Sequence, residues 1–127
     1  MRNFLLSRYQ SFGHAFRGWW YVMRTQRNAW IHAVAAIIVF GFAFWLRVSA
    51  IDWAVLILTI AMVFAAEFLN TAIEAVVDLA SPEKHPLAKV GKDVGAAAVL
   101  ISAGAAVLIG LLLLGPPLWE KIISLFR

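Results

Sequence analysis

Hydrophobic residues run along most of this chain in long stretches, and short polar clusters separate these stretches from one another. Three of the stretches are long enough for a helix to cross a hydrocarbon core of roughly 30 Å. We expect membrane-spanning helices over residues 29–46, 53–78 and 94–114. The connection between the first two spans is so short that they should form an antiparallel hairpin.

The segment before the first span has a different pattern. Over residues 7–26, aromatic and aliphatic side chains recur at helical spacing and alternate with arginines. This pattern is typical of an amphipathic helix that lies in the membrane interface. The polar cluster at residues 24–28 either contacts a phosphate or is simply solvated. We interpret His32 as an interfacial hydrogen-bonding residue rather than a metal ligand, because no carboxylate or histidine follows it at helical spacing.

Composition sets the class of protein. Of the 127 residues, 63% are hydrophobic and 14% are charged, and this apolar share is too high for a soluble fold of this size. We therefore predict a single all-α membrane domain over residues 1–127, without a cleavable signal peptide. Cysteine is absent, which excludes disulfides and thiolate metal sites. The net charge is +4, and the basic residues lie beside apolar spans. This placement favours membrane lipids or phosphates over nucleic acid as partners.

The distribution of lysine and arginine predicts the orientation in the membrane. Five arginines precede the first span and three lysines lie between the second and third spans, whereas the opposite side has three basic residues. Cytoplasmic segments carry the excess of Lys and Arg. We expect a multi-pass protein of the cytoplasmic (inner) membrane with its N-terminus in the cytoplasm.

A polar stripe crosses the end of the second span. At about 100° per residue, Glu67, Asn70, Glu74 and Asp78 fall within an arc of roughly 80° on one helix face, and we call these four residues the acidic stripe. A carboxylate at membrane depth costs roughly 2.5 kcal/mol or more, so these groups should face other helices, water or a cation. A packing role accounts for one such carboxylate but less well for three, because like charges repel in a low dielectric.

The loop after the second span adds positive charge at the same membrane surface, with Lys89 and Lys92 beside Asp93. Carboxylates hold Mg²⁺ together with substrate phosphates, and lysine neutralises a phosphoryl group during transfer. A further carboxylate can take a proton from a lipid hydroxyl. These features favour phosphoryl transfer to a lipid alcohol, although the chain has no P-loop and no protein-kinase signature. The alternative is a small oligomeric proton- or cation-coupled transporter, which has less use for the Lys92-Asp93 pair.

The third span carries small residues at every fourth position, which allow another helix to approach closely. These residues are Ala98, Ser102, Ala106 and Gly110. The approaching helix can belong to the same chain or to another subunit. We expect the span to end at Gly115-Pro116-Pro117, because proline stops helices.

Two segments resemble a known family. Residues 67–78, EFLNTAIEAVVD, and residues 88–100, AKVGKDVGAAAVL, are similar to the bacterial integral membrane diacylglycerol kinases. The resemblance covers about residues 11–114 and includes the order of an interfacial helix, three spans and a cytoplasmic loop. Near the N-terminus, Phe16-Arg17-Gly18 and residues 24–32 look more like the branch that acts on undecaprenol than the branch that acts on diacylglycerol.

The resemblance implies a homotrimeric helical bundle that transfers the γ-phosphate of MgATP to undecaprenol or diacylglycerol, with ATP as co-substrate and active sites shared between subunits. It also implies the role of each site residue. Glu67 matches the general base, Glu74 a metal ligand, Asp78 a neighbouring polar residue, and Asn70, Lys92, Asp93, Arg17 and Gly91 the nucleotide or phosphate side.

One position departs from the family pattern. Counting eight residues on from Gly18, the second Mg²⁺-binding carboxylate of the family falls at Gln26, which is an amide in this chain. An amide oxygen can contact a cation but brings no charge. We expect a lowered Mg²⁺ affinity or metal count if Gln26 belongs to the site.

Overall fold

The fold is known from a computed structural model that describes residues 2–126. Within this range the chain forms four helices and no strand. The helices are α1 (Arg2–Thr25), α2 (Arg27–Leu46), α3 (Ala50–Ala80) and α4 (Pro86–Ser124). By length and composition, α2, α3 and α4 can each cross a membrane. The predicted class, an all-α membrane protein, is therefore confirmed.

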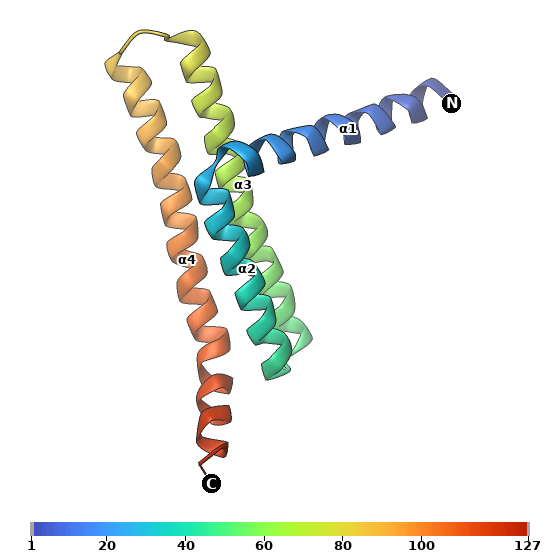
Figure 1. The fold of residues 1–127 in the computed structure, drawn as a ribbon, viewed down its shortest axis with the longest axis vertical. Coiled ribbons are helices and arrows are strands. Elements are labelled where there is room, and N and C mark those ends of the chain that lie inside the picture. The colour runs from blue at the N-terminus through green and yellow to red at the C-terminus, as the bar shows by residue number, and fades with distance from the viewer. Residues whose placement is uncertain (1, 127) are drawn as a thin grey trace.

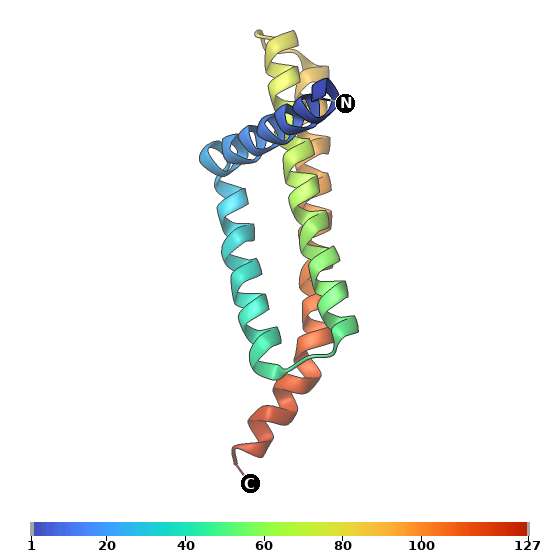
Figure 2. The same cartoon turned by 90° about the vertical axis from the view of Figure 1, so that its right-hand side faces the viewer.

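Three of the helices form a bundle, and the fourth leaves it. Figure 1 shows α3 and α4 as a long antiparallel pair with α2 beside them, while α1 projects away at a steep angle. Figure 2 shows α1 crossing the bundle near the end where α2 begins. This direction suits a helix that lies along a membrane surface while its neighbours cross the bilayer. The interfacial position of α1 stays a prediction.

The helices extend beyond the ranges that the hydrophobic pattern indicates. α4 begins at Pro86, because a proline in the first turn lacks only an N–H that would have no partner there. Its start is capped by His85, whose Nδ1 accepts a hydrogen bond from the Leu87 N–H at 3.2 Å. The expected stop at Gly115-Pro116-Pro117 is corrected by the structure, since α4 continues to Ser124. Figure 2 shows this last part of α4 turning away from α3.

A tight turn connects α2 to α3. Arg47 adopts a left-handed conformation, with φ of 54°, and its N–H bonds back to carbonyls of the last turn of α2. Ser49 then caps α3 through a reciprocal pair of contacts: its Oγ accepts from the Asp52 N–H at 3.2 Å, and the Asp52 carboxylate accepts from the Ser49 N–H at 3.1 Å. The helix thus starts at Ala50, one turn before the expected Trp53.

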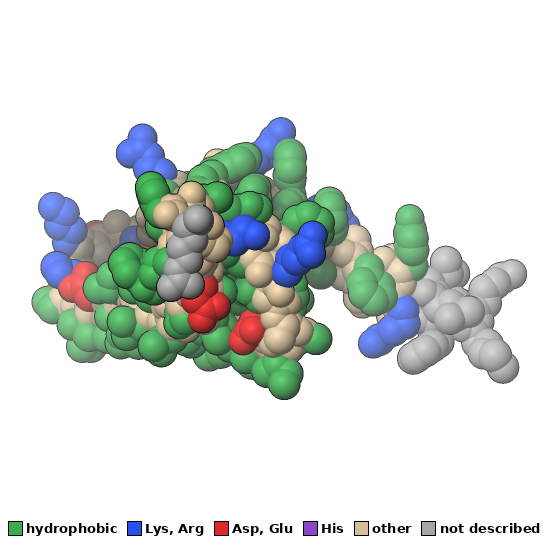
Figure 3. Space-filling model, turned by 90° about the horizontal axis from the view of Figure 1, so that it is seen from below, with side chains coloured by type: hydrophobic (Ala, Val, Ile, Leu, Met, Phe, Trp, Pro, Cys, Tyr) green, Lys and Arg blue, Asp and Glu red, His purple; other side chains and the backbone are tan. Residues whose placement is uncertain are grey.

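Most of the surface is apolar. Figure 3 shows hydrophobic side chains over much of the face seen from below, and Phe44, Leu100 and Leu112 are each more than 70% exposed. Such a surface needs lipid or other protein chains to cover it. In the small-residue stripe of α4, Ala106 and Gly110 line a cavity between α2, α3 and α4, and a Cβ built on Gly110 would meet nothing within 4 Å.

The capping contacts predict a stability effect. Replacing Ser49 by Ala removes the hydroxyl that accepts from the Asp52 N–H, and we expect a loss of about 1 kcal/mol in the free energy of unfolding. Reversible unfolding in detergent micelles, followed by circular dichroism, measures the change. Ser49→Thr keeps the hydroxyl and serves as the control. Equal stability of the Ala and Thr variants would contradict this role of the cap.

Candidate active site

The acidic stripe leads from the interior of the bundle to an exposed end. Glu67 and Asn70 are only 1% and 7% exposed, Glu74 is half-buried, and Asp78 near the loop is exposed. α4 covers this face of α3 in part, with Gly95 buried against Asn70 and Lys92 paired with Asp78. The sequence prediction that these residues share one face next to Lys92 is consistent with this geometry.

Asn70 holds one carboxylate of the stripe. Its Nδ2 donates a hydrogen bond to Oε1 of Glu74, one helical turn further on, at 2.9 Å. The Asn70 Oδ1 is buried and has no hydrogen-bond partner among the described residues. Asn70 therefore orients Glu74 with its amide nitrogen, while its amide oxygen faces Gly95 of α4.

A glycine in α4 makes room for this amide. A Cβ built on Gly95 would overlap with the Asn70 Oδ1 and would lie 3.4 Å from its Cγ. The nearest atom is the end of the Asn70 side chain, which is buried and held by its hydrogen bond to Glu74, and the Asn70 Cα lies 3.8 Å from the added Cβ. The close approach of α3 and α4 at this level thus requires glycine, which the sequence prediction missed because glycine in an apolar helix is common.

The exposed end of the stripe carries two ion pairs. Lys92 pairs with Asp78 of α3, and Lys89 pairs with Asp93 one turn along α4. These four side chains surround a cavity of about 520 Å³ beside the α3–α4 loop. Exposed ion pairs add little to stability, so both lysines can exchange their carboxylate partners for a phosphate at little cost. Gly91 lies between them, where a Cβ would meet only Val77 at 3.6 Å.

Two predicted site residues are not brought to the stripe within one chain. Arg17 bonds within α1, where its Nε donates to the Gly13 carbonyl at 3.3 Å and its guanidinium contacts the His14 ring at 3.3 Å. Gln26 is the single residue between α1 and α2, and its side chain does not cap α2. In the described part of the chain, no hydrogen bond connects either side chain to the acidic stripe.

His32 lies next to the buried carboxylate, which the sequence prediction missed. Its Nε2 is buried without a hydrogen-bond partner in the described residues, so its interpretation as an interfacial hydrogen-bonding residue stays a prediction. The ring meets Phe64 edge-on, with 6.4 Å between centroids, and His32 interacts electrostatically with Glu67. Spacing along one helix cannot reveal this neighbour, because His32 belongs to α2 and Glu67 to α3.

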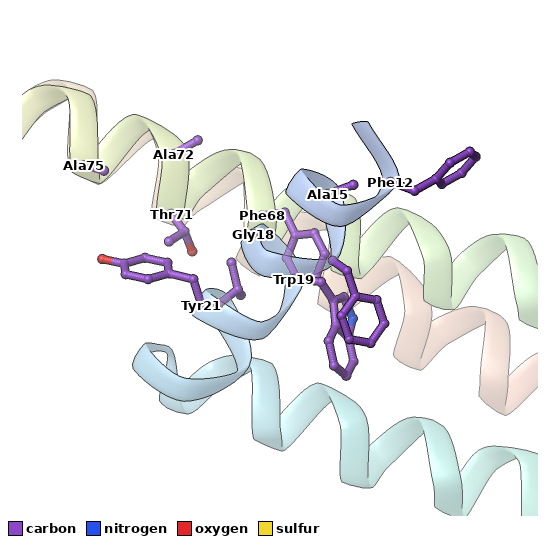
Figure 4. Close-up of a pocket in the computed structure, with 11 residues that line it drawn as sticks. Phe12, Ala15, Gly18, Trp19, Tyr21, Phe68, Thr71, Ala72 and Ala75 are labelled. Atoms are coloured by element: carbon purple, nitrogen blue, oxygen red, sulfur yellow. The ribbon is translucent and has the colours of Figure 1, made fainter. Parts of the chain in front are cut away.

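An apolar groove lies between α1 and α3 beside the same turn of α3. Figure 4 shows Phe12, Trp19 and Tyr21 of α1 around it, opposite Phe68 and Thr71 of α3. Its volume is about 760 Å³, and nearly all of its lining is hydrophobic. Phe68 and Thr71 lie within four residues of Glu67 along α3, so this groove lies beside the helix turns that carry the acidic stripe.

The Gly95 contact predicts a stability effect. In Gly95→Ala the added methyl group collides with the Asn70 amide, and the Asn70–Glu74 hydrogen bond is lost as the amide moves. Overpacking of this kind costs typically about 1–3 kcal/mol, measurable by reversible unfolding in detergent. Gly104→Ala, in the same helix, meets nothing within 4 Å and should leave stability unchanged or slightly raised. The contact is refuted if both variants unfold alike.

Comparison with known proteins identifies the family. Residues 13–114 match the sequence model of the family described as prokaryotic diacylglycerol kinase. The chain is 45% identical to the undecaprenol kinase of Bacillus subtilis over 117 residues, which are 92% of this chain and 95% of the relative. It is 48% identical to a diacylglycerol kinase of Synechocystis sp. over 109 residues, 85% of this chain and 62% of the relative.

A third relative agrees with these two. The diacylglycerol kinase of Escherichia coli is 41% identical over 101 residues, which are 74% of this chain and 83% of the relative. All three relatives are named as kinases of lipid alcohols, and the transporter alternative receives no support from them. The chain therefore belongs to the prokaryotic diacylglycerol kinase family and is a membrane lipid kinase.

Proposed function

We propose that this membrane lipid kinase transfers the γ-phosphate of MgATP to a lipid alcohol, undecaprenol or diacylglycerol, at the cytoplasmic surface of the inner membrane. Undecaprenol is the favoured acceptor, because the alignment with the Bacillus subtilis undecaprenol kinase extends over nearly the whole of both chains. The observation that carries the proposal is the acidic stripe itself. It joins a buried carboxylate, Glu67, to an exposed end with two lysines.

Glu67 is the general base of the proposed reaction. Its carboxylate takes the proton of the acceptor hydroxyl while the hydroxyl oxygen forms a bond to the γ-phosphorus. The bond from this phosphorus to the β–γ bridging oxygen breaks, and the bonding electron pair leaves with ADP. Glu67 suits this role because its Oε2 is buried and has no hydrogen-bond partner in the described chain, so it can accept a proton from a buried hydroxyl.

Glu74 is the metal ligand of the proposal. Mg²⁺ is bound in proteins by one or two carboxylates together with substrate phosphates and water, and bound Mg²⁺ neutralises the charge on the β- and γ-phosphates. The residues present fit this requirement, because Glu74 is half-buried and the Asn70 hydrogen bond orients its carboxylate. No group of three His, Asp or Glu side chains forms a larger metal site in the described chain.

The remaining predicted residues hold the nucleotide. Lys92 is the phosphate ligand, and Gly91 beside it belongs to the same phosphate site. Asp78 and Asp93 keep Lys92 and Lys89 in place until the phosphates arrive. Arg17 belongs to the same phosphate site and reaches it from a neighbouring subunit, since within its own chain it bonds only along α1.

A homotrimer with shared active sites is part of the proposal. It is supported by the large exposed apolar faces of α2 and α4 and by the separation of Arg17 and Gln26 from the acidic stripe within one chain. A neighbouring copy can cover these apolar faces and can bring its own Arg17 and Gln26 to the acidic stripe. The proposed orientation, with the N-terminus in the cytoplasm, places all of these groups where MgATP is available.

Both carboxylates are expected to be essential for turnover. Glu67→Gln removes the proton acceptor and Glu74→Gln removes the metal ligand, and each should lower kcat by at least about a hundredfold. Transfer of radiolabelled phosphate from ATP to undecaprenol and to dioleoylglycerol in mixed micelles measures this. Glu120→Gln, on the exposed end of α4, is the matched control. Full turnover in the Glu74 variant would remove the metal role, and no transfer to either lipid by the unaltered chain would overturn the function.

The amide at position 26 predicts a distinct Mg²⁺ dependence. Gln26→Glu restores a carboxylate where the family pattern has one, so the Mg²⁺ concentration for half-maximal turnover should fall several-fold. Gln10→Glu adds the same charge at an exposed position of α1 and should have no such effect. An unchanged Mg²⁺ dependence in the Gln26 variant would remove this residue from the site.

A further inference from the structure

Two buried polar atoms close to each other lack a partner. These atoms are Nε2 of His32 in α2 and Oε2 of Glu67 in α3, and neither has a hydrogen bond in the described chain. Burying a polar group without a hydrogen bond costs free energy, so native structures pair such groups with protein, water or ligand. The His32 ring contacts Phe64, which precedes Glu67 by three residues on α3, and the electrostatic interaction between His32 and Glu67 agrees with this neighbourhood.

The surroundings limit what can fill the space between them. The His32 ring packs edge-on against Phe64, and Phe64 packs against Phe68 with 6.1 Å between centroids. His32 also lines an apolar cavity of about 510 Å³ between α2, α3 and α4, at the end where Phe64 lies. Among the residues that line this cavity, His32 is the only ionisable one. A ligand that is apolar over most of its length and carries one hydroxyl suits such a place.

The cavity continues the face of the acidic stripe. At about 100° per residue, Val63 and Phe64, which line the cavity, lie on the same side of α3 as Glu67. This face of α3 is therefore apolar before Glu67 and acidic from Glu67 onward. His32 contacts Phe64, just before this boundary. A lipid alcohol whose chain lies against the apolar part brings its hydroxyl to this boundary.

We propose that His32 and Glu67 hold the acceptor hydroxyl between them, an inference that rests on the proposed function. The Nε2–H of His32 donates a hydrogen bond to the hydroxyl oxygen, and this oxygen donates its own hydrogen to Glu67 Oε2. The second lone pair of the oxygen stays available to attack the γ-phosphorus. In the transfer the proton moves to Glu67, the new O–P bond forms, and ADP leaves as described above. His32 is thus a substrate-binding residue for the lipid and has no contact with ATP.

This role predicts which kinetic constants change. His32→Phe keeps an aromatic ring against Phe64 but has no N–H, so kcat/KM for the acceptor should fall about tenfold or more, while KM for ATP stays unchanged. His32→Gln carries an amide N–H at a similar reach and should recover most of the loss. If the His32 ring had a purely structural role, its loss would change the kinetic constants for both substrates alike, and His32→Gln would not restore acceptor kcat/KM.

The test uses the full-length protein in mixed micelles, with undecaprenol and dioleoylglycerol as acceptors and initial rates measured over a range of each substrate. His32→Asn, whose amide is one methylene shorter, should lose acceptor kcat/KM like the Phe variant, and it replaces that variant if the Phe protein does not fold. Ile37→Phe places the same ring at an exposed position of α2 and should leave the acceptor KM unchanged.

The outcomes separate this inference from the proposed function. Phosphate transfer by the unaltered chain together with an unchanged acceptor kcat/KM in the His32 variants would overturn the role of His32 alone. A rise in KM for ATP equal to the rise for the acceptor would also overturn it. Absence of transfer to both lipids by the unaltered chain would overturn the proposed function and this inference together. A selective acceptor effect with rescue by Gln supports the inference.

Discussion

The close approach of α3 and α4 is the constraint on which the rest of the site depends. Carboxylates at membrane depth are costly unless they face protein, water or a cation, and Glu67 and Asn70 meet this condition because α4 covers them. The absence of a side chain at Gly95 permits that coverage without displacing the Asn70 amide. The amide in turn orients Glu74, so one small residue in α4 determines the positions of polar groups along two turns of α3.

The site combines environments that a soluble protein rarely places so close together. At one end of the stripe, a carboxylate is enclosed by aromatic and aliphatic side chains. At the other, two lysines and two aspartates are exposed around the α3–α4 loop. A lipid alcohol and a charged nucleotide prefer these opposite environments, and a helix of 31 residues that extends past the apolar region connects them. The length of α3 is therefore part of the chemistry.

Weak contacts also have a function in this arrangement. The ion pairs of Lys89 and Lys92 are exposed and add little to stability, which leaves both lysines available for phosphate. The buried atoms without partners, on His32, Glu67 and Asn70, reduce the stability of the unliganded chain. A substrate that pairs with these atoms recovers that cost on binding. The least satisfied part of the bundle is accordingly the part that we assign to catalysis.

The sequence by itself determined the helical class, the three apolar spans and the grouping of Glu67, Asn70 and Glu74 on one face. These features follow from local periodicity, because residues on one helix have fixed angular relations. Only the tertiary structure decided which helices meet: the approach of His32 to the part of α3 that carries Glu67, the close contact at Gly95 and the contacts of Arg17 within α1. Such contacts depend on how helices pack against each other, and no spacing within a single helix contains that information. The continuation of α4 through Pro116 and Pro117 is likewise visible only in the structure, because local propensity predicts a stop at these residues.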